Sequence, residues 1–226
     1  MKLKLFFLSI LSLFSLGSCI EIFDDLTIHT DGTGTFKYNI NLSSSKLKIN
    51  SILALDSLDG KKVPSIQFIK DEIARIKAKF ETQEGISNVT IESNFTDFLF
   101  KMKCDFTNIN VLQEAIKRIV SEENLTKNMD DLSHSWVTWD SQKLTRSIPE
   151  LTINKTKELT ENEIELLKQG KYTSITRFDK TIEKFDNASA KLSASKQAIM
   201  LQTDTYSLIK NAKLLENTIY LSPLKN

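Results

Sequence analysis

The feature that most constrains the fold is an alternation of apolar and polar residues from position 98 to position 106. The apolar set occupies every second position, and lysine and aspartate fill most of the places between: Phe98, Phe100, Met102, Cys104, Phe106. Successive side chains of a β-strand point to opposite faces, so this pattern predicts a strand with one buried face and one solvated face. Cys104 falls on the apolar face, where we expect an inert core thiol.

Two β-hairpins are predicted in the first half of the chain. In residues 26–42, Leu26 and Ile28 alternate on one arm and Phe36 to Leu42 on the other, around the turn Asp31-Gly32-Thr33-Gly34. Two glycines there supply the positive φ angles that tight turns need. The second hairpin joins residues 89–95 to the alternating strand, with its turn at 94–97.

Two amphipathic helices are predicted to follow the hairpins. The first begins with Pro64 at its first position, ends at Gly85, and shows one apolar stripe: Ile66, Ile69, Ile73, Ile76, Phe80. The second follows a cap at Asn108 or Asn110 and shows a stripe at the same spacing: Leu112, Ala115, Ile116, Ile119, Val120. Residues 43–58 are expected to form a short helix or an ordered connection.

The second half of the chain has weaker patterns. Strands are expected at 136–139, 172–178 and 190–204, and a capping box at Thr160 and Glu163 predicts a short helix that ends at Gly170. Residues 207–221 fit either a helix or a turn followed by a strand. The sequence thus predicts the α+β class, with antiparallel hairpins alternating with helices on one face of the sheet, as one domain over 26–226.

The N-terminal residues form a pattern of their own. Lys2 and Lys4 precede an apolar run over 5–16, which is too short to span a hydrocarbon layer of about 30 Å. The run closes on Leu16-Gly17-Ser18-Cys19. Two interpretations of this pattern are an ordinary secretory signal with an incidental cysteine, and a short membrane anchor.

This N-terminal pattern resembles the lipobox of bacterial lipoprotein precursors. The resemblance implies cleavage between Ser18 and Cys19, removal of the signal peptide 1–18, and acylation of Cys19 by a diacylglycerol and a fatty acid such as palmitate. Two or more acyl chains anchor a protein stably, whereas one gives only marginal binding. Membrane lipid, bound through acylated Cys19, is therefore the expected partner.

Residues 19–25 are expected to form a short lipidated tether. Ile20 follows the lipidated cysteine instead of the aspartate that retains such proteins at the inner membrane, so the resemblance favours the outer membrane. Glu21, Asp24 and Asp25 resemble a signal that exports lipoproteins to the cell surface, and they fit a solvated acidic loop equally well.

Few residues suggest chemistry. The chain holds two histidines, His29 and His134, which with one core cysteine do not supply a zinc site, and no cofactor motif is present. His134 follows Asp130-Asp131-Leu132-Ser133, but neighbours in sequence do not make a catalytic triad. A balance of 30 basic against 29 acidic residues argues against nucleic-acid binding.

These observations favour a membrane-anchored, non-catalytic binding or assembly factor of the bacterial cell envelope, with an envelope protein or lipid as its partner. The alternative is a carrier or chaperone of an apolar ligand, such as a lipid, held in a groove between helices and sheet; an enzyme is the third reading. The hairpin around Asp31-Gly32-Thr33-Gly34, with Phe36 and Tyr38 on its second arm, and the two hairpin–helix units resemble small envelope lipoproteins of the LppM type. That resemblance implies no functional residues.

Overall fold

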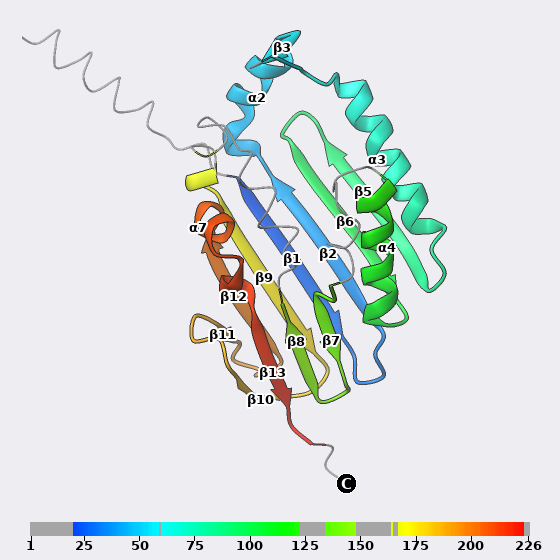
Figure 1. Ribbon diagram of the computed structural model, residues 1–226, viewed down its shortest axis with the longest axis vertical. Coiled ribbons are helices and arrows are strands. Elements are labelled where there is room, and N and C mark those ends of the chain that lie inside the picture. The colour runs from blue at the N-terminus through cyan, green and yellow to red at the C-terminus, as the bar shows by residue number, and fades with distance from the viewer. Residues whose placement is uncertain (1–19, 59, 123–133, 148–163, 165–166, 224–226) are drawn as a thin grey trace, which may run out of the picture.

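The structure is a computed structural model that describes residues 20–58, 60–122, 134–147, 164 and 167–223 of the 226-residue chain. Its centre is a seven-stranded sheet in the order β11-β12-β9-β1-β2-β6-β5 (Figure 1). The strands are β1 (Glu21–Ile28), β2 (Gly34–Asn41), β5 (Ile86–Asn94), β6 (Leu99–Phe106), β9 (Lys171–Phe178), β11 (Lys191–Leu192) and β12 (Ala198–Asp204).

The predicted hairpins are confirmed. β1 pairs with β2 and β5 with β6, both antiparallel, and β2 pairs with β6 so that Leu26, Phe36 and Cys104 lie side by side on one face. Cys104 is fully buried in the hydrophobic core, as its place in the alternation predicts. On the opposite face of the sheet Lys37, Lys101 and Lys103 are exposed.

The central pair of strands is parallel. β9 runs alongside β1, so a strand from the second half of the chain completes the sheet begun by the first hairpin. Hairpin patterns do not reveal such a pairing, because it joins segments far apart in sequence.

Helices α3 (Ile66–Glu81) and α4 (Ile109–Glu122) cover one face of this sheet (Figure 1), which confirms the α+β class. The Ser65 side chain caps α3 by accepting from Phe68 N at 3.1 Å, so Pro64 precedes the cap and is not the first helical residue as predicted. α3 ends at Glu81, and Gly85, with φ +81°, leads into β5 instead of ending the helix. For α4 the first predicted cap is confirmed, since Asn108 Oδ1 accepts from Val111 N at 3.1 Å.

A second sheet covers the remaining part of the same face (Figure 1). It contains β7 (Val137–Trp139), β8 (Lys143–Arg146), β10 (Ile182–Phe185) and β13 (Asn217–Leu221), in the order β10-β13-β8-β7. Its core contact with the large sheet includes the ring of Trp139, which stacks on Phe178 with centroids 5.9 Å apart. The sequence predicted a strand at 136–139 but not a second sheet.

The C-terminal segments differ in detail from their predictions. The expected strand at 190–204 is two strands, β11 and β12, joined by a turn in which Lys196 has φ 56°. Residues 207–221 combine both alternatives, because α7 (Thr205–Lys210) and η4 (Ala212–Leu215) precede β13. The capping box at Thr160 and Glu163 lies outside the described residues.

A small arm leaves the sheet at the end of β2. It consists of η1 (Ser43–Ser45), α2 (Lys46–Leu53) and a hairpin of β3 (Ser57–Leu58) and β4 (Lys61–Lys62), and it leads into α3. α2 confirms the short helix expected within 43–58.

The N-terminal part of the domain begins earlier than predicted. β1 starts at Glu21 and not near Leu26, so residues 21–25 of the expected tether belong to the sheet. Ser18 and Cys19 lie outside the described residues. Within the described ranges, no helix is both long enough and apolar enough to cross a bilayer.

Candidate ligand-binding cavity

A buried ion pair joins the two sheets. Asp24, on the inward face of β1 and 3% exposed, receives two hydrogen bonds from Arg146 on β8: Nη1 to Oδ1 at 2.9 Å and Nη2 to Oδ2 at 2.9 Å. Ser174 Oγ donates to Oδ1 at 2.8 Å, and the Tyr172 hydroxyl donates to Oδ2. The carboxylate is thus satisfied by three side chains, which is what a charge buried at this depth requires.

This arrangement keeps Asp24 ionised. Burial alone raises the pKa of a carboxyl, but the Arg146 guanidinium and the hydrogen bonds from Arg146, Tyr172 and Ser174 outweigh it and hold the pKa of Asp24 below its usual range. Burial, together with the charge of Asp24, raises the pKa of the Tyr38 hydroxyl to about 12. The tyrosine is therefore a neutral hydrogen-bond donor at physiological pH.

The acidic cluster of the sequence belongs to β1, so the prediction of a solvated acidic loop is wrong, while the export signal stays a prediction. Asp24 is buried in the ion pair, Asp25 accepts from Arg177 Nε at 2.9 Å, and Glu21 accepts from Asn41 Nδ2 at 3.0 Å. The cluster is neither a solvated loop nor part of a free tether, because strand alternation sends Asp24 inward and its neighbour outward. Alternation with Leu26 and Ile28 indicates the inward direction of Asp24, but local patterns do not identify its partner arginine, which lies 122 positions away.

A cavity of about 530 Å³ opens directly beside the ion pair. It lies between the inward face of the large sheet, α4, the start of β7 and the α7–η4 segment. Its lining is mostly apolar: Leu26, Phe36, Phe80, Met102, Ile109, Leu112, Ile116, Val120, Trp136, Val137, Leu208 and Leu215. Pockets for small molecules fall in the range of about 300–1,000 Å³ and combine apolar walls with a few polar groups, as this one does.

One wall of the cavity is held in place by Gln113 of α4. Its Oε1 accepts from Trp136 N at 2.6 Å and Val137 N at 3.0 Å, and its Nε2 donates to Val137 O at 2.9 Å. The side-chain amide bonds to the backbone of Trp136 and Val137 at the start of β7, as a neighbouring strand would. Gln113 is 3% exposed, so it positions the Trp136–Val137 wall against α4.

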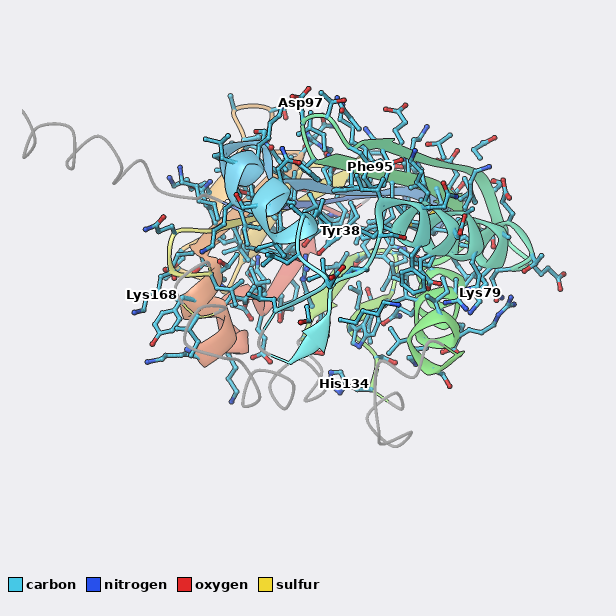
Figure 2. The ribbon with its side chains drawn as sticks, turned by 90° about the horizontal axis from the view of Figure 1, so that it is seen from above. Tyr38, Lys79, Phe95, Asp97, His134 and Lys168 are labelled. Carbon is cyan, nitrogen blue, oxygen red and sulfur yellow. The ribbon has the colours of Figure 1, made fainter. Side chains whose placement is uncertain are left out.

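The polar side of the cavity carries no net charge. Asp24 and Arg146 are the charged groups of its lining, and they neutralise each other. Tyr38 also lines the cavity, and its hydroxyl has no hydrogen-bond partner within the described part of the chain. Figure 2 shows Tyr38 well inside the molecule. The cavity can therefore bury an apolar chain together with a small uncharged acceptor, such as an ester carbonyl.

The two histidines of the sequence lie at the surface. His29, at the end of β1, is 3.9 Å from the Asp179 carboxylate and half exposed. His134 is exposed (Figure 2) and its Nε2 lies 2.8 Å from Ser147 Oγ, which also donates to Ser135 O at 3.1 Å. Ser147 lines the cavity, but no carboxylate of the described residues bonds to His134, so the pair lacks the third group of a triad.

Other sites in the described residues are less suited to binding a ligand. Within the described ranges there is no group of three or more His, Cys, Asp or Glu residues that could hold a metal ion. A depression of about 690 Å³ lies at one end of the small sheet and is lined by Asp140, Glu183, Lys184 and Tyr220 among others. Most of its lining residues are exposed to solvent, so it buries a ligand less well than the apolar cavity.

Comparisons with known proteins complete this description. No protein-family model matches the chain, and no curated protein matches it. Among solved structures, it is similar to the NMR structure of the folded domain of LppM from Mycobacterium tuberculosis, the type that the hairpin order of the sequence resembles. The TM-score is 0.42 at 9% sequence identity, over 92% of this chain and 93% of that one.

Proposed function

We propose that this protein is a lipid-anchored envelope protein that binds an apolar ligand, without catalysis, in the cavity between α4 and the large sheet. The single observation that carries the proposal is the cavity of about 530 Å³, with apolar walls and a neutral polar group of Asp24, Arg146 and Tyr38 at one side. Such a lining favours an acyl chain with an uncharged polar group over a fatty-acid anion. An unpaired carboxylate would lose its hydration there without gaining a free cation.

The cavity favours the carrier reading over a factor that only presents a surface to a protein partner. Protein interiors are packed to a density near that of organic crystals, with few voids larger than a water molecule. An apolar cavity of this size, open to solvent on one side, leaves a dozen apolar side chains without packing contacts on that side, and an apolar ligand would supply them. The membrane supplies ligands of this chemistry.

The anchor rests on the sequence. Ser18-Cys19 resembles a lipoprotein cleavage site, and β1 begins two residues after Cys19. Acylation would hold the cavity close to its source of ligand. The outer membrane, favoured by Ile20, is the proposed location.

Binding of an apolar fluorescent acyl probe tests the cavity. Met102 and Lys101 are adjacent on β6, and they face the cavity and the opposite, solvated face of the sheet respectively. We expect Met102→Trp to obstruct part of the cavity and to weaken probe binding at least tenfold, whereas Lys101→Trp leaves it unchanged. Equal binding by both variants would contradict the proposal.

A second obstructing variant covers the case in which Met102→Trp fails to fold. Ile116→Trp approaches the cavity from α4, so it should reduce binding in the same way. The Tyr38→Phe variant removes the free hydroxyl, and we expect it to weaken binding of ester-containing lipids more than binding of plain hydrocarbons.

The lipid anchor has a separate test. Cys19→Ser should leave precursor that is unprocessed or released from membranes.

A further inference from the structure

The arm between β2 and α3 exposes large apolar side chains. Of the six large apolar residues that are clearly exposed in the described structure, five lie in the arm or in the first turn of α3 that follows it: Leu47, Leu55, Leu58, Ile66 and Phe68. Leu47 is 85% exposed and Phe68 55%. We call these five residues the apolar arm. Exposed apolar side chains concentrated in one stretch of a chain indicate a surface that contacts a partner or a membrane.

The arm is also basic. Residues 46–70 hold five lysines and two aspartates, which leaves 25 basic against 27 acidic residues in the rest of the chain. Lys48 and Lys62 are exposed, and Lys46 is paired with Asp97. Apolar side chains flanked by lysines match the chemistry of an anionic lipid surface, where headgroups attract the lysines and the interface accepts the apolar groups.

The arm stands at the end of the sheet where the N-terminal segment enters. Glu21 at the start of β1 pairs with Asn41 at the end of β2, and η1 begins two residues after Asn41. The chain position of the proposed lipid anchor, Cys19, therefore precedes the strand end that lies beside the arm. Figure 2, which views this end, shows the β3–β4 hairpin between α2 and α3.

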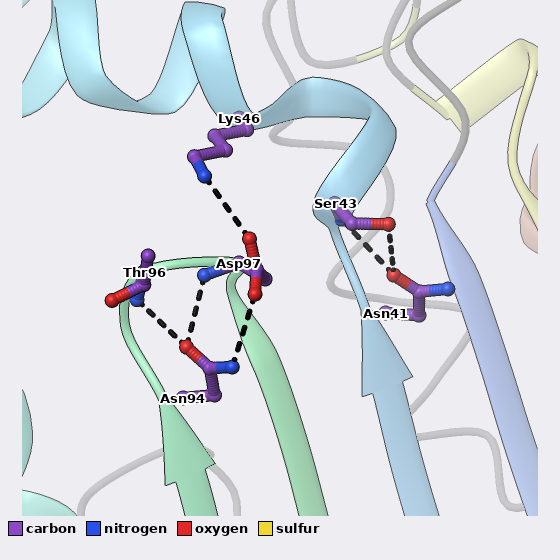
Figure 3. A network of polar contacts seen from close by, with 6 residues as sticks. All are labelled: Asn41, Ser43, Lys46, Asn94, Thr96 and Asp97. Carbon is purple, nitrogen blue, oxygen red and sulfur yellow. Dashed lines mark hydrogen bonds and ion pairs between the residues drawn. The ribbon is translucent and has the colours of Figure 1, made fainter.

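The start of the arm is held firmly. Lys46 Nζ donates to Asp97 Oδ1 at 3.0 Å, and Asn94 fixes the β5–β6 turn by accepting from Thr96 N at 2.9 Å and Asp97 N at 3.0 Å (Figure 3). Asn41 Oδ1 accepts from Ser43 N at 3.0 Å at the exit from β2. These contacts connect the start of α2 to the β5–β6 turn, and in this arrangement Leu47 is exposed.

From these observations we infer that the apolar arm inserts into the surface of an anionic membrane beside the N-terminal anchor and fixes the orientation of the domain on the bilayer. The inference rests on the proposed anchoring but not on the cavity, whose lining contains none of the five residues of the arm. A second copy of the chain and a protein partner are the other occupants that the experiment distinguishes.

An environment-sensitive fluorophore on the arm tests this inference in the full chain. Leu58→Cys places it on the β3–β4 hairpin, and Ala194→Cys places it in the β11–β12 turn at the opposite end of the sheet. Cys104 is fully buried and burial raises its pKa to about 12, so it should not react. The parent chain, carried through the same labelling, reports any label taken by Cys19.

Each labelled chain is reconstituted in vesicles of equal parts phosphatidylcholine and phosphatidylglycerol, and flotation first reports whether the chain is anchored. We expect nitroxide-labelled lipids to quench the Leu58 probe several-fold more than the Ala194 probe. The Leu47→Ser/Phe68→Ser variant should abolish the difference. Floating chains in which both probes are quenched alike would overturn the inference and leave the anchor intact.

Charge and self-association are tested in the same system. Lys48→Ala/Lys62→Ala should reduce the contact of the arm with these vesicles by about fivefold per lysine, an effect that salt weakens, whereas Lys191→Ala/Lys196→Ala at the other end should not. The Leu58 probe is also measured without vesicles at increasing protein concentration. If its fluorescence then reports a progressively less polar environment, a second copy of the chain covers the arm. That result would also overturn the inference.

Discussion

Arg146 and Asp24 form a bidentate ion pair, with both N–O distances at 2.9 Å, that joins the small sheet to the large one beside the apolar cavity. The two residues stand 122 positions apart, so the pair joins distant segments of the chain beside its candidate site. The pair serves both the stability of the domain and the neutrality of the cavity.

Removing one member of this ion pair should lower the stability of the folded domain. We expect Arg146→Leu to lower the free energy of unfolding by about 3–5 kcal/mol, because Asp24 stays buried without its cation. Replacing both residues with leucine should recover a large part of that loss. Urea unfolding measures both effects. The matched control is Arg177→Leu, whose pair with Asp25 is more exposed and is worth about 0–1 kcal/mol; equal losses for Arg146→Leu and Arg177→Leu would contradict the assigned role.

Acidic pH should remove the contribution of Asp24 to the stability of the folded domain. Its pKa is lowered in the folded state, so the stabilisation is complete above the unfolded-state pKa of about 3.9 and is lost as pH falls through the folded-state value. We therefore expect the difference in urea midpoint between the parent chain and Asp24→Asn to be constant from neutral pH down to about 5 and to shrink below about 4. A difference that does not depend on pH would refute the ionised state of Asp24.

Alkali should act through Tyr38. Its pKa is raised to about 12, so the folded state favours the neutral hydroxyl. That stabilisation is complete below the unfolded-state pKa of about 10 and is lost as pH rises toward the folded-state value. Ultraviolet titration of phenolate should show one late-titrating tyrosine fewer in Tyr38→Phe. If the variant instead lacks a tyrosine that titrates near the ordinary pKa of about 10, the Tyr38 hydroxyl lies in water.

Gln113 should hold the cavity wall. Gln113→Leu keeps the size of the side chain but leaves the amides of Trp136 and Val137 without their acceptor, at about 1–3 kcal/mol for buried groups. We expect faster hydrogen exchange at these two amides and weaker binding of the acyl probe. Gln202→Leu, at an exposed position of β12, is the control and should change neither. Unchanged exchange in Gln113→Leu would show that the wall is held by packing alone.

The sequence predicted the first half of the fold better than the second, for a physical reason. Alternation around Met102 and helical spacing around Ile116 are local patterns, and they correctly predicted β6 and α4. The parallel pairing of β1 with β9 and the small sheet depend on contacts between distant segments, which periodicity does not encode. The second sheet also has short strands, in which a period of two is hard to recognise.

The candidate site was predicted only in outline. A groove between helices and sheet was one of the readings, and a cavity lies there, but its polar side depends on Asp24, which the sequence placed in an acidic tether. An aspartate in alternation with Leu26 and Ile28 was the available signal, since strand geometry sends all three to one face. Because the strand was predicted to start only near Leu26, Asp24 was not assigned to it.

The most direct test of the account is the lipid content of the protein itself. The chain is purified from envelope membranes in mild detergent, and native mass spectrometry measures the non-covalent ligand bound per chain, alongside any acyl groups on Cys19. We predict about one uncharged acyl lipid per parent chain, none in Met102→Trp, and the parent amount in Lys101→Trp. A parent chain without bound lipid, or lipid retained equally in Met102→Trp, would contradict the claim that the cavity is a ligand site.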